Sequence, residues 1–216
     1  LTKDSALGRF EYASMPQQTL MEMLIDGITN REVVSGSKDS PKDISKWKNI
    51  KLNGHGEVIE IDLHSSGLEG SISLEWLPMT VTKVIFTLNT LSGSVDCDNL
   101  NETLEHLALN RNTLSGTTSL IGLPSVMNTL FLNYNTFVGT VDLTRLPDTM
   151  QALSLAYNKY CGVIEITHLP RVLRFLNLSE NAFAGETDFT QLPDSLKFFY
   201  FDGNTELSGT ITARKG

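Results

Sequence analysis

Cysteine is scarce in this chain, which has 216 residues and two cysteines, Cys97 and Cys161. Secreted domains that depend on disulfides carry a larger cysteine framework. The pair favours an intracellular, reducing compartment, although a leader removed from before Leu1 would be compatible with a secreted or surface form. No apolar run approaches the roughly 18–20 residues that a membrane span needs, so we expect a soluble chain without one.

Basic residues are also in the minority. The chain carries 17 Lys and Arg against 25 Asp and Glu, a formal net charge of -8. Non-specific nucleic-acid binding depends on Lys and Arg that neutralise phosphates. We therefore expect no nucleic-acid partner.

The motifs of catalysis and metal binding are missing as well. The four histidines include no pair at metal-binding spacing, and the chain has no Cys-x-x-Cys, no Gly-x-Ser-x-Gly and no Gly-Lys-Ser/Thr. We therefore predict that the protein is not an enzyme and has no cofactor and no metal site.

What the chain does contain is a repeat with a period of 23 residues. One position recurs at this interval without a slip, as Ser66, Asn89, Asn112, Asn135, Asn158, Asn181 and Asn204. Gly follows four residues later in each copy but the last, where it slips by one to Gly209, and alternating apolar residues precede each copy. A fixed period of this kind predicts seven stacked coils over residues 58–216.

The pattern L-x-x-L-x-L-x-x-N-x-L resembles that of the leucine-rich repeat family, over residues 58–212. The copies that end in Leu-Pro are similar to plant receptor repeats and still more to repeats of kinetoplastid protist proteins. The resemblance implies an α/β repeat solenoid, a right-handed coil with a parallel concave sheet, a mostly β and irregular convex side and a helical N-terminal cap. In most relatives the concave surface binds a protein.

Elementary chemistry predicts the same coil. Alternating apolar side chains point inward from a short strand, and each coil buries them only against its neighbours. Stacked Asn side chains then bond turn backbone that would otherwise be unpaired. We interpret the six asparagines as a structural ladder: Asn89, Asn112, Asn135, Asn158, Asn181 and Asn204.

Residues 1–57 break the period and form the expected cap. Ser14 and Gln17 have the spacing of a capping box, and an apolar stripe predicts a helix over about 15–28. The polar stretch 31–42 is expected to be a mobile loop. The segment from Trp47 to Val58 resembles the cap of plant-type repeat proteins, but that cap has a disulfide and residues 1–96 contain no cysteine.

At the other end, no polar cap follows Phe199, Phe201, Leu207 and Ile211. Solenoids need a cap at each terminus. Either the sequence is a piece of a longer protein, or another chain covers this edge, which leaves a monomer or a C-terminal-edge dimer as the alternatives.

The positions between the inward residues face the concave surface, and their aromatic members gather in the later repeats. Phe131 stands on one side, Phe175, Phe198 and Tyr200 stand on the other, and repeat 5 between them has only Ala152, Ser154 and Ala156. We expect a hollow there that binds a partner. The alternative is that the rings stack only on one another.

Three further features keep two interpretations each. Tyr134 and Tyr157, one position before Asn, extend the aromatic patch or merely cover their own turns. The acidic column could bind Ca²⁺, although local backbone bonds are commoner; it comprises Asp96, Asp142, Glu165 and Asp188. Two glycosylation sequons begin at Asn101 and Asn177, and sugar on Asn177 would obstruct the patch.

Taken together, the sequence predicts a non-enzymatic module that presents a rigid concave surface to a protein partner. The alternative is a structural or assembly subunit that joins a larger complex through its open C-terminal edge. The partner's identity does not follow from the repeat, because solenoids of one shape have many functions.

Overall fold

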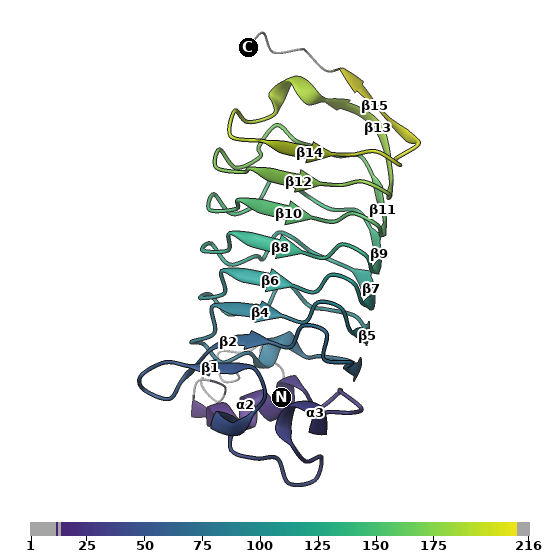
Figure 1. Ribbon diagram of the computed structural model, residues 1–216. Coiled ribbons are helices and arrows are strands. Elements are labelled where there is room, and N and C mark those ends of the chain that lie inside the picture. The colour runs from purple at the N-terminus through teal and green to yellow at the C-terminus, as the bar shows by residue number, and fades with distance from the viewer. Residues whose placement is uncertain (1–11, 13, 211–216) are drawn as a thin grey trace.

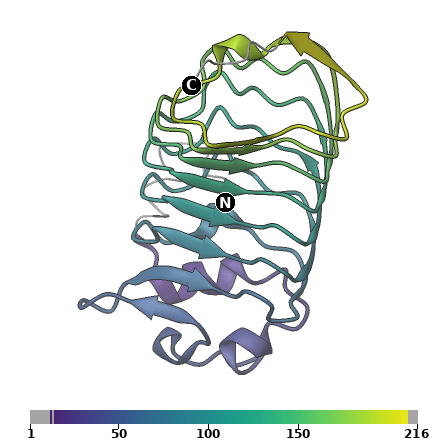
Figure 2. The same cartoon turned by 45° about the horizontal axis from the view of Figure 1, so that its top comes forward.

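The computed structural model describes residue 12 and residues 14–210, which wind into a solenoid of stacked coils (Figure 1). Each coil contributes one strand to each of two parallel sheets, and the two sheets enclose the core between them (Figure 2). The predicted leucine-rich repeat solenoid is therefore confirmed as the fold of the described residues.

The first sheet has eight strands and is parallel apart from its first pair. In spatial order its strands are β1 (Ile50–Leu52), β2 (Val58–Asp62), β4 (Lys83–Ile85), β6 (His106–Ala108), β8 (Thr129–Phe131), β10 (Ala152–Ser154), β12 (Phe175–Asn177) and β14 (Phe198–Tyr200). From β2 on, partners lie 23 residues apart, as Thr129 and Ala152 do. The outward face of this sheet, called the strand face below, is the surface that the sequence pattern predicts to be concave.

The opposite side is more regular than expected, because it forms a second parallel sheet. Its seven strands are β3 (Glu69–Gly70), β5 (Thr90–Gly93), β7 (Thr113–Thr117), β9 (Thr136–Gly139), β11 (Lys159–Gly162), β13 (Ala182–Asp188) and β15 (Glu206–Thr210). Threonine side chains extend the pairing from coil to coil: Thr113 Oγ1 donates to Leu91 O at 2.9 Å, and Thr136 Oγ1 donates to Leu114 O at 2.8 Å. The irregular part of this side is limited to the connections, where two short 3₁₀ helices occur, η2 (Leu74–Trp76) and η3 (Phe189–Gln191).

The core is a continuous stack of the inward apolar positions. Leu107 and Leu109 of one coil and Leu130 and Leu132 of the next are fully buried, and the same positions are buried from Ile61 to Leu178. Burying an aliphatic side chain of this size stabilises the fold by about 1.5–3 kcal/mol, so each coil depends on the neighbours that cover it.

The asparagine ladder satisfies the backbone at the turn between the two sheets. Asn112 Nδ2 donates to Leu109 O in its own coil and to Phe86 O in the previous coil, both at 2.9 Å. Its Oδ1 accepts from Leu91 N at 3.1 Å. The other five asparagines of the ladder make the equivalent bonds. Each amide therefore bonds three backbone groups that would otherwise be left unpaired inside the molecule.

The N-terminal helix is shorter than the predicted 15–28. Helix α2 spans Gln17–Leu24 and begins after Pro16, which occupies the N-cap position and makes no side-chain cap. The expected capping box is therefore wrong. The Gln17 side chain instead bonds the junction between the cap and the first coil, donating to Gly56 O at 2.5 Å and accepting from Val58 N at 2.9 Å.

The helix also ends early because the chain after it pairs with β3. Ile28 forms an antiparallel bridge with Gly70, and Gly27 O accepts from Ser71 N at 2.9 Å. The approach is so close that a Cβ on Gly27 would lie 2.3 Å from Ser71 Oγ. The cap is thus joined to the first coil by backbone bonds as well as by packing.

The expected loop 31–42 contains a short helix, α3 (Glu32–Ser35), so it is not loop throughout; its mobility stays a prediction. It is followed by a 3₁₀ turn, η1 (Ile44–Lys46), and by the buried Trp47, whose Nε1 donates to Lys42 O at 2.7 Å. Strand β1 then pairs antiparallel with β2. The cap therefore contributes a strand to the first sheet, although the repeats begin at residue 58.

Candidate binding surface

The strand face is built from the outward positions of three-residue strands. Because side chains alternate along a strand, the residues on either side of each inward leucine point to solvent. The parallel register then aligns them in columns across the sheet: Phe175 lies between Ala152 and Phe198, and Ser154 lies between Phe131 and Asn177.

Aromatic rings form a continuous line across this face, here called the aromatic run. The ring centroids of His106 and Phe131 are 6.2 Å apart, with the rings edge to face. The centroids of Phe131 and Phe175 are also 6.2 Å apart, again edge to face. The centroids of Phe175 and Tyr200 are 6.0 Å apart. These distances lie within the range of favourable aromatic pairs. The run therefore extends from β6 to β14 and passes over β10.

The structure brings the two rings on either side of the expected hollow in repeat 5 close together, and the hollow itself stays a prediction. Strands β8 and β12 lie on either side of β10, about 9.6 Å apart at the usual spacing of about 4.8 Å per strand. The Phe131 and Phe175 ring centroids are closer than this, so the two rings lean toward each other above β10. In this coil Ser154 and Ala156 are buried and Ala152 is half-buried.

Phe198 and Tyr200 are the most accessible aromatic residues of the expected patch. Their relative exposures are 53% and 44%, whereas Phe131 and Phe175 are half-buried. Exposed aromatic side chains next to one another are a usual feature of protein-binding surfaces. The late repeats thus present the apolar part of the strand face.

The early repeats present charge instead. Lys83 Nζ lies 2.6 Å from Glu60 Oε1, and Lys51 Nζ lies 3.8 Å from Glu60 Oε2. The hydrogen bond from Lys83 lowers the pKa of the Glu60 carboxyl. Beside this network, Asp62 and His64 help to line a depression of about 450 Å³ at the edge formed by β1. The strand face is therefore divided into a charged half and an aromatic half.

His106 joins the two halves. It is half-buried, next to Lys83 in the register and edge to face with Phe131. Burial and the neighbouring Lys83 lower the pKa of His106, with Glu60 acting in the opposite direction. The sequence places His106 in the column of Phe175, but the period alone does not show that its ring would continue the aromatic run.

Tyr134 and Tyr157 form a stacked pair at the rim, where the chain leaves the first sheet. Their rings are 4.2 Å apart and 7° from parallel, and the Arg111 guanidinium lies 4.6 Å from the Tyr134 ring. All three residues have left-handed backbone, with φ of 54–58°. That shared conformation aims successive side chains in the same direction, which explains the stack. Each tyrosine is packed against a neighbouring coil, and both stay exposed beside the aromatic half.

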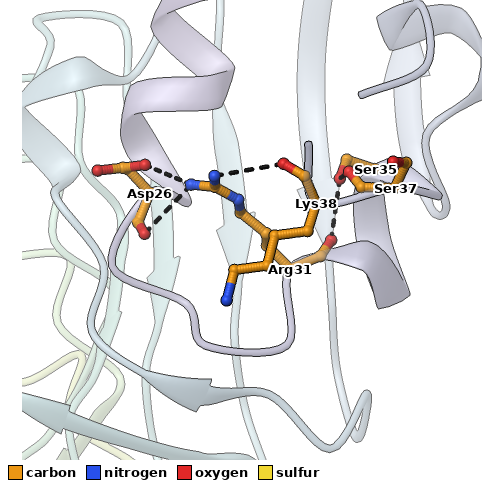
Figure 3. Close-up of polar contacts among 5 residues, drawn as sticks. All are labelled: Asp26, Arg31, Ser35, Ser37 and Lys38. Atoms are coloured by element: carbon orange, nitrogen blue, oxygen red, sulfur yellow. Dashed lines mark hydrogen bonds and ion pairs between the residues drawn. The ribbon is translucent and has the colours of Figure 1, made fainter. Parts of the chain in front are cut away.

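The cap contains a separate polar cluster (Figure 3). Arg31 pairs with the Asp26 carboxylate, and its Nη2 donates to Lys38 O at 3.3 Å. The Ser35 hydroxyl donates to Ser37 O at 2.9 Å. These contacts join the end of helix α2 to the segment after α3, beside a depression of about 620 Å³ that also has acidic and apolar walls. They fit a role in holding the cap together.

The acidic column makes local bonds. Asp142 and Asp188 each accept from the backbone N–H and hydroxyl of the threonine two residues on, and Glu165 accepts from Thr167 N. Hydrogen bonding with the threonine side chain, and then with its backbone N–H, lowers the pKa of all three carboxyls. No group of three candidate metal ligands occurs among the described residues.

The packing of the core determines how accessible the two cysteines and one glycosylation sequon are. Cys97 is buried and Cys161 is exposed, and both are free thiols. Asn101 is 2% exposed, and its amide donates to Pro78 O at 2.7 Å, so in the fold this sequon is closed to glycosylation. Asn177 is half-buried on the strand face.

Within the described part of the chain, no helix is long and apolar enough to cross a membrane.

Comparison with known proteins relates the fold to plant receptor ectodomains. The structure resembles that of a pollen receptor kinase 3 with a TM-score of 0.70 and 23% identity, over 92% of this chain and 99% of that one. It resembles the leucine-rich repeat ectodomain of the receptor kinase SOBIR1 from Arabidopsis thaliana with a TM-score of 0.56 and 20% identity, over 91% and 96% of the chains. The PEPR1–AtPEP1 structure gives a TM-score of 0.64 and 20% identity over 86% of this chain, which spans 27% of that one.

These likenesses identify the class of fold, a leucine-rich repeat solenoid. No family model matches the chain, and no curated protein matches it. The likeness to kinetoplastid proteins stays a prediction.

Proposed function

We propose that the protein is a binding module whose strand face recognises a segment of a protein partner. The observation that carries the proposal is the accessibility of Phe198 and Tyr200 at the end of the aromatic run. Aromatic side chains supply large contact areas at low cost in conformational entropy, and they are enriched among residues that dominate binding energies.

A rigid scaffold supports this role. Each coil is held by inward packing, by two parallel ladders and by its asparagine, so the outward side chains are fixed before a partner arrives. A preformed surface pays less ordering entropy on association than a flexible one. Similar structures include that of PEPR1 with AtPEP1 and a complex of BIR3 with SERK2, and these complexes support a recognition role.

The division of the strand face gives the partner a chemistry. The aromatic half fits apolar or aromatic side chains, and the half with Lys83, Glu60 and Asp62 fits polar or charged ones. We infer that the partner presents an apolar anchor at one end and a polar flank at the other. Rim charges of this kind contribute more to orientation and association rate than to affinity.

The experiment is an affinity purification from the source cells, compared across three forms of the chain. The wild type is expected to retain a partner that Phe198→Ala loses. Val163→Ala is the matched control, because Val163 is 63% exposed but lies beyond β11, on the opposite side of the coil. If all three forms retain the partner equally, the proposal that the strand face binds it is wrong.

An assembly role through the C-terminal edge is a second candidate. Among the described residues β14 has a neighbour on one side only, and the rings of Phe189, Phe199 and Phe201 cluster at this end of the solenoid, with Phe201 37% exposed. An unpaired strand edge readily accepts another chain. Light scattering at micromolar concentration separates the alternatives: a dimer that Phe201→Asp dissociates supports the edge contact, and a monomer rejects a dimer through this edge.

The intracellular location remains part of the proposal. The free thiols of Cys97 and Cys161 support it, and the likeness to receptor ectodomains favours a secreted or surface form instead. Fractionation of the source cells with an antibody to the native chain decides between them.

A further inference from the structure

Tyr134 and Tyr157 are placed to react with each other as well as to pack. Their ring centroids are 4.2 Å apart and their planes 7° from parallel, whereas the Phe199 and Phe201 centroids are 4.9 Å apart. They occupy the same position of adjacent coils, and each has left-handed backbone, at φ of 57° and 54°. Backbone bonds hold both, since Tyr134 N donates to Ala156 O and Tyr157 N donates to Ser179 O, each at 2.9 Å.

The pair is also open to solvent. Tyr134 is 38% exposed and Tyr157 is 42% exposed, so an oxidant can reach both phenols. Arg111 covers the outer face of the Tyr134 ring, which leaves Tyr157 as its ring neighbour on the other side. On the Tyr157 side, the neighbouring Tyr134 phenol, then burial, and then the charges of Glu180 and Asp202 raise the pKa of Tyr157.

We infer that Tyr134 and Tyr157 are an oxidative coupling site, which a haem peroxidase and hydrogen peroxide convert to an intramolecular dityrosine. Each phenol loses one electron and one proton to the oxidant and becomes a phenoxyl radical whose spin extends to the ring carbons next to the oxygen. A carbon–carbon bond then forms between one such carbon of each ring. The hydrogens on these carbons move to the oxygens and restore both phenols, and hydrogen peroxide is reduced to two molecules of water.

The other three tyrosines of the chain are not arranged for this reaction. Tyr12 is 4% exposed, and burial raises its pKa to about 12. Tyr160 is fully buried between Phe137 and Phe183 and bonds the Thr118 hydroxyl. Tyr200 is as exposed as the pair, but its ring contact is with Phe175, which cannot couple in this way. Tyr200 therefore serves as an internal control.

The product would staple repeats 4 and 5 at the rim. The new bond joins two residues 23 positions apart in the chain and in adjacent coils, directly beside the aromatic half of the strand face. Coupling would therefore restrain the rim under oxidising conditions, because the two linked tyrosine side chains could no longer move independently. This consequence stands whether or not the strand face binds a protein.

The test treats the dilute full chain with horseradish peroxidase and hydrogen peroxide and follows dityrosine fluorescence. All forms carry Cys161→Ser, because the exposed thiol competes for the oxidant. The parent is expected to give a monomer that has lost two hydrogens, with the linked peptides containing Tyr134 and Tyr157. Tyr134→Phe and Tyr157→Phe keep a ring in the stack and are expected to lower the signal to background, whereas Tyr200→Phe leaves it unchanged.

Several results would overturn the inference. One is an undiminished signal in Tyr157→Phe, and another is a product that is mainly an intermolecular dimer linked through Tyr200. The third is no dityrosine in the parent under conditions that couple N-acetyltyrosine in the same reaction. Melting curves of the phenylalanine variants confirm that each remains folded.

Discussion

The Phe131 and Phe175 rings meet edge to face, 6.2 Å apart, above a strand to which neither residue belongs. Small residues in that strand, Ala152 and Ser154, allow the contact. The aromatic half of the strand face is therefore partly a packed structure, and the exposed rings that we propose as the binding residues lie beyond this contact, at Phe198 and Tyr200.

The first prediction separates packing from binding within this group. Phe131→Ala removes edge-to-face contacts with His106 and Phe175, each worth about 0.5–1.5 kcal/mol, and should lower the free energy of unfolding by roughly 1–2 kcal/mol. Phe198→Ala removes an exposed ring and should change it by less than about 0.5 kcal/mol. Urea unfolding measures both. Equal losses would mean that Phe198 is a packing residue as well.

The second prediction concerns the asparagine ladder. Asn135→Ala removes bonds to Leu109 O, Leu132 O and Leu114 N, and each buried group left unpaired costs about 1–3 kcal/mol. We expect a loss of roughly 3 kcal/mol or more in thermal or urea unfolding. Asn133→Ala, on the strand face of the same coil, is the matched control and should be nearly neutral. A neutral Asn135→Ala would show that the ladder does not stabilise the coils.

The third prediction concerns the two thiols. Burial raises the pKa of Cys97 to about 12, and its side chain is 1% exposed, whereas Cys161 is open to solvent. A thiol reagent such as Ellman's reagent should label one cysteine in the native chain and both after unfolding. Cys161→Ser should abolish the native reaction. Rapid native labelling of Cys97 would contradict the packing of this coil.

The fourth prediction concerns pH. Burial, together with Lys83, lowers the pKa of His106, so the folded state takes up a proton less readily than the unfolded chain does. The contribution of neutral His106 to the free energy of unfolding is therefore complete above the pKa of the unfolded chain, about 6.5. It is lost as the pH falls through the lowered pKa of the folded state. The unfolding midpoint should drop across this window, and His106→Gln should make that drop shallower. Because Glu60 and Lys83 face His106, a Lys83→Met variant should raise the His106 pKa in an NMR titration.

Much of this architecture follows from the period. Once Leu107 and Leu109 are taken as inward, the outward columns and the asparagine positions are fixed by the 23-residue spacing, and the structure places Asn112 and its counterparts accordingly. The same arithmetic locates Phe131, Phe175, Phe198 and Tyr200 on one face. These assignments hold from coil to coil because each coil repeats the sequence pattern of the coil before it.

The rest depends on contacts that a period does not contain. The contact between the Phe131 and Phe175 rings follows from the directions in which the two side chains lean, and those depend on side-chain rotamers in three coils at once. In the cap, an apolar stripe continues to Ile28, but Gly27 to Thr29 pairs with β3 instead of extending the helix. Pairing with β3 overrides the helical pattern there, and the apolar pattern of the local sequence does not indicate this pairing.

The central claim is that the aromatic half of the strand face binds a partner, and the most direct test is the affinity of the captured partner for two variants. Phe198→Ala should raise the Kd at least about tenfold, a loss of roughly 1.4 kcal/mol, with an unchanged melting temperature. Val163→Ala, which truncates a still more exposed apolar side chain on the opposite side of the coil, should leave the Kd unchanged. Equal Kd values for both variants and the wild type would contradict the account.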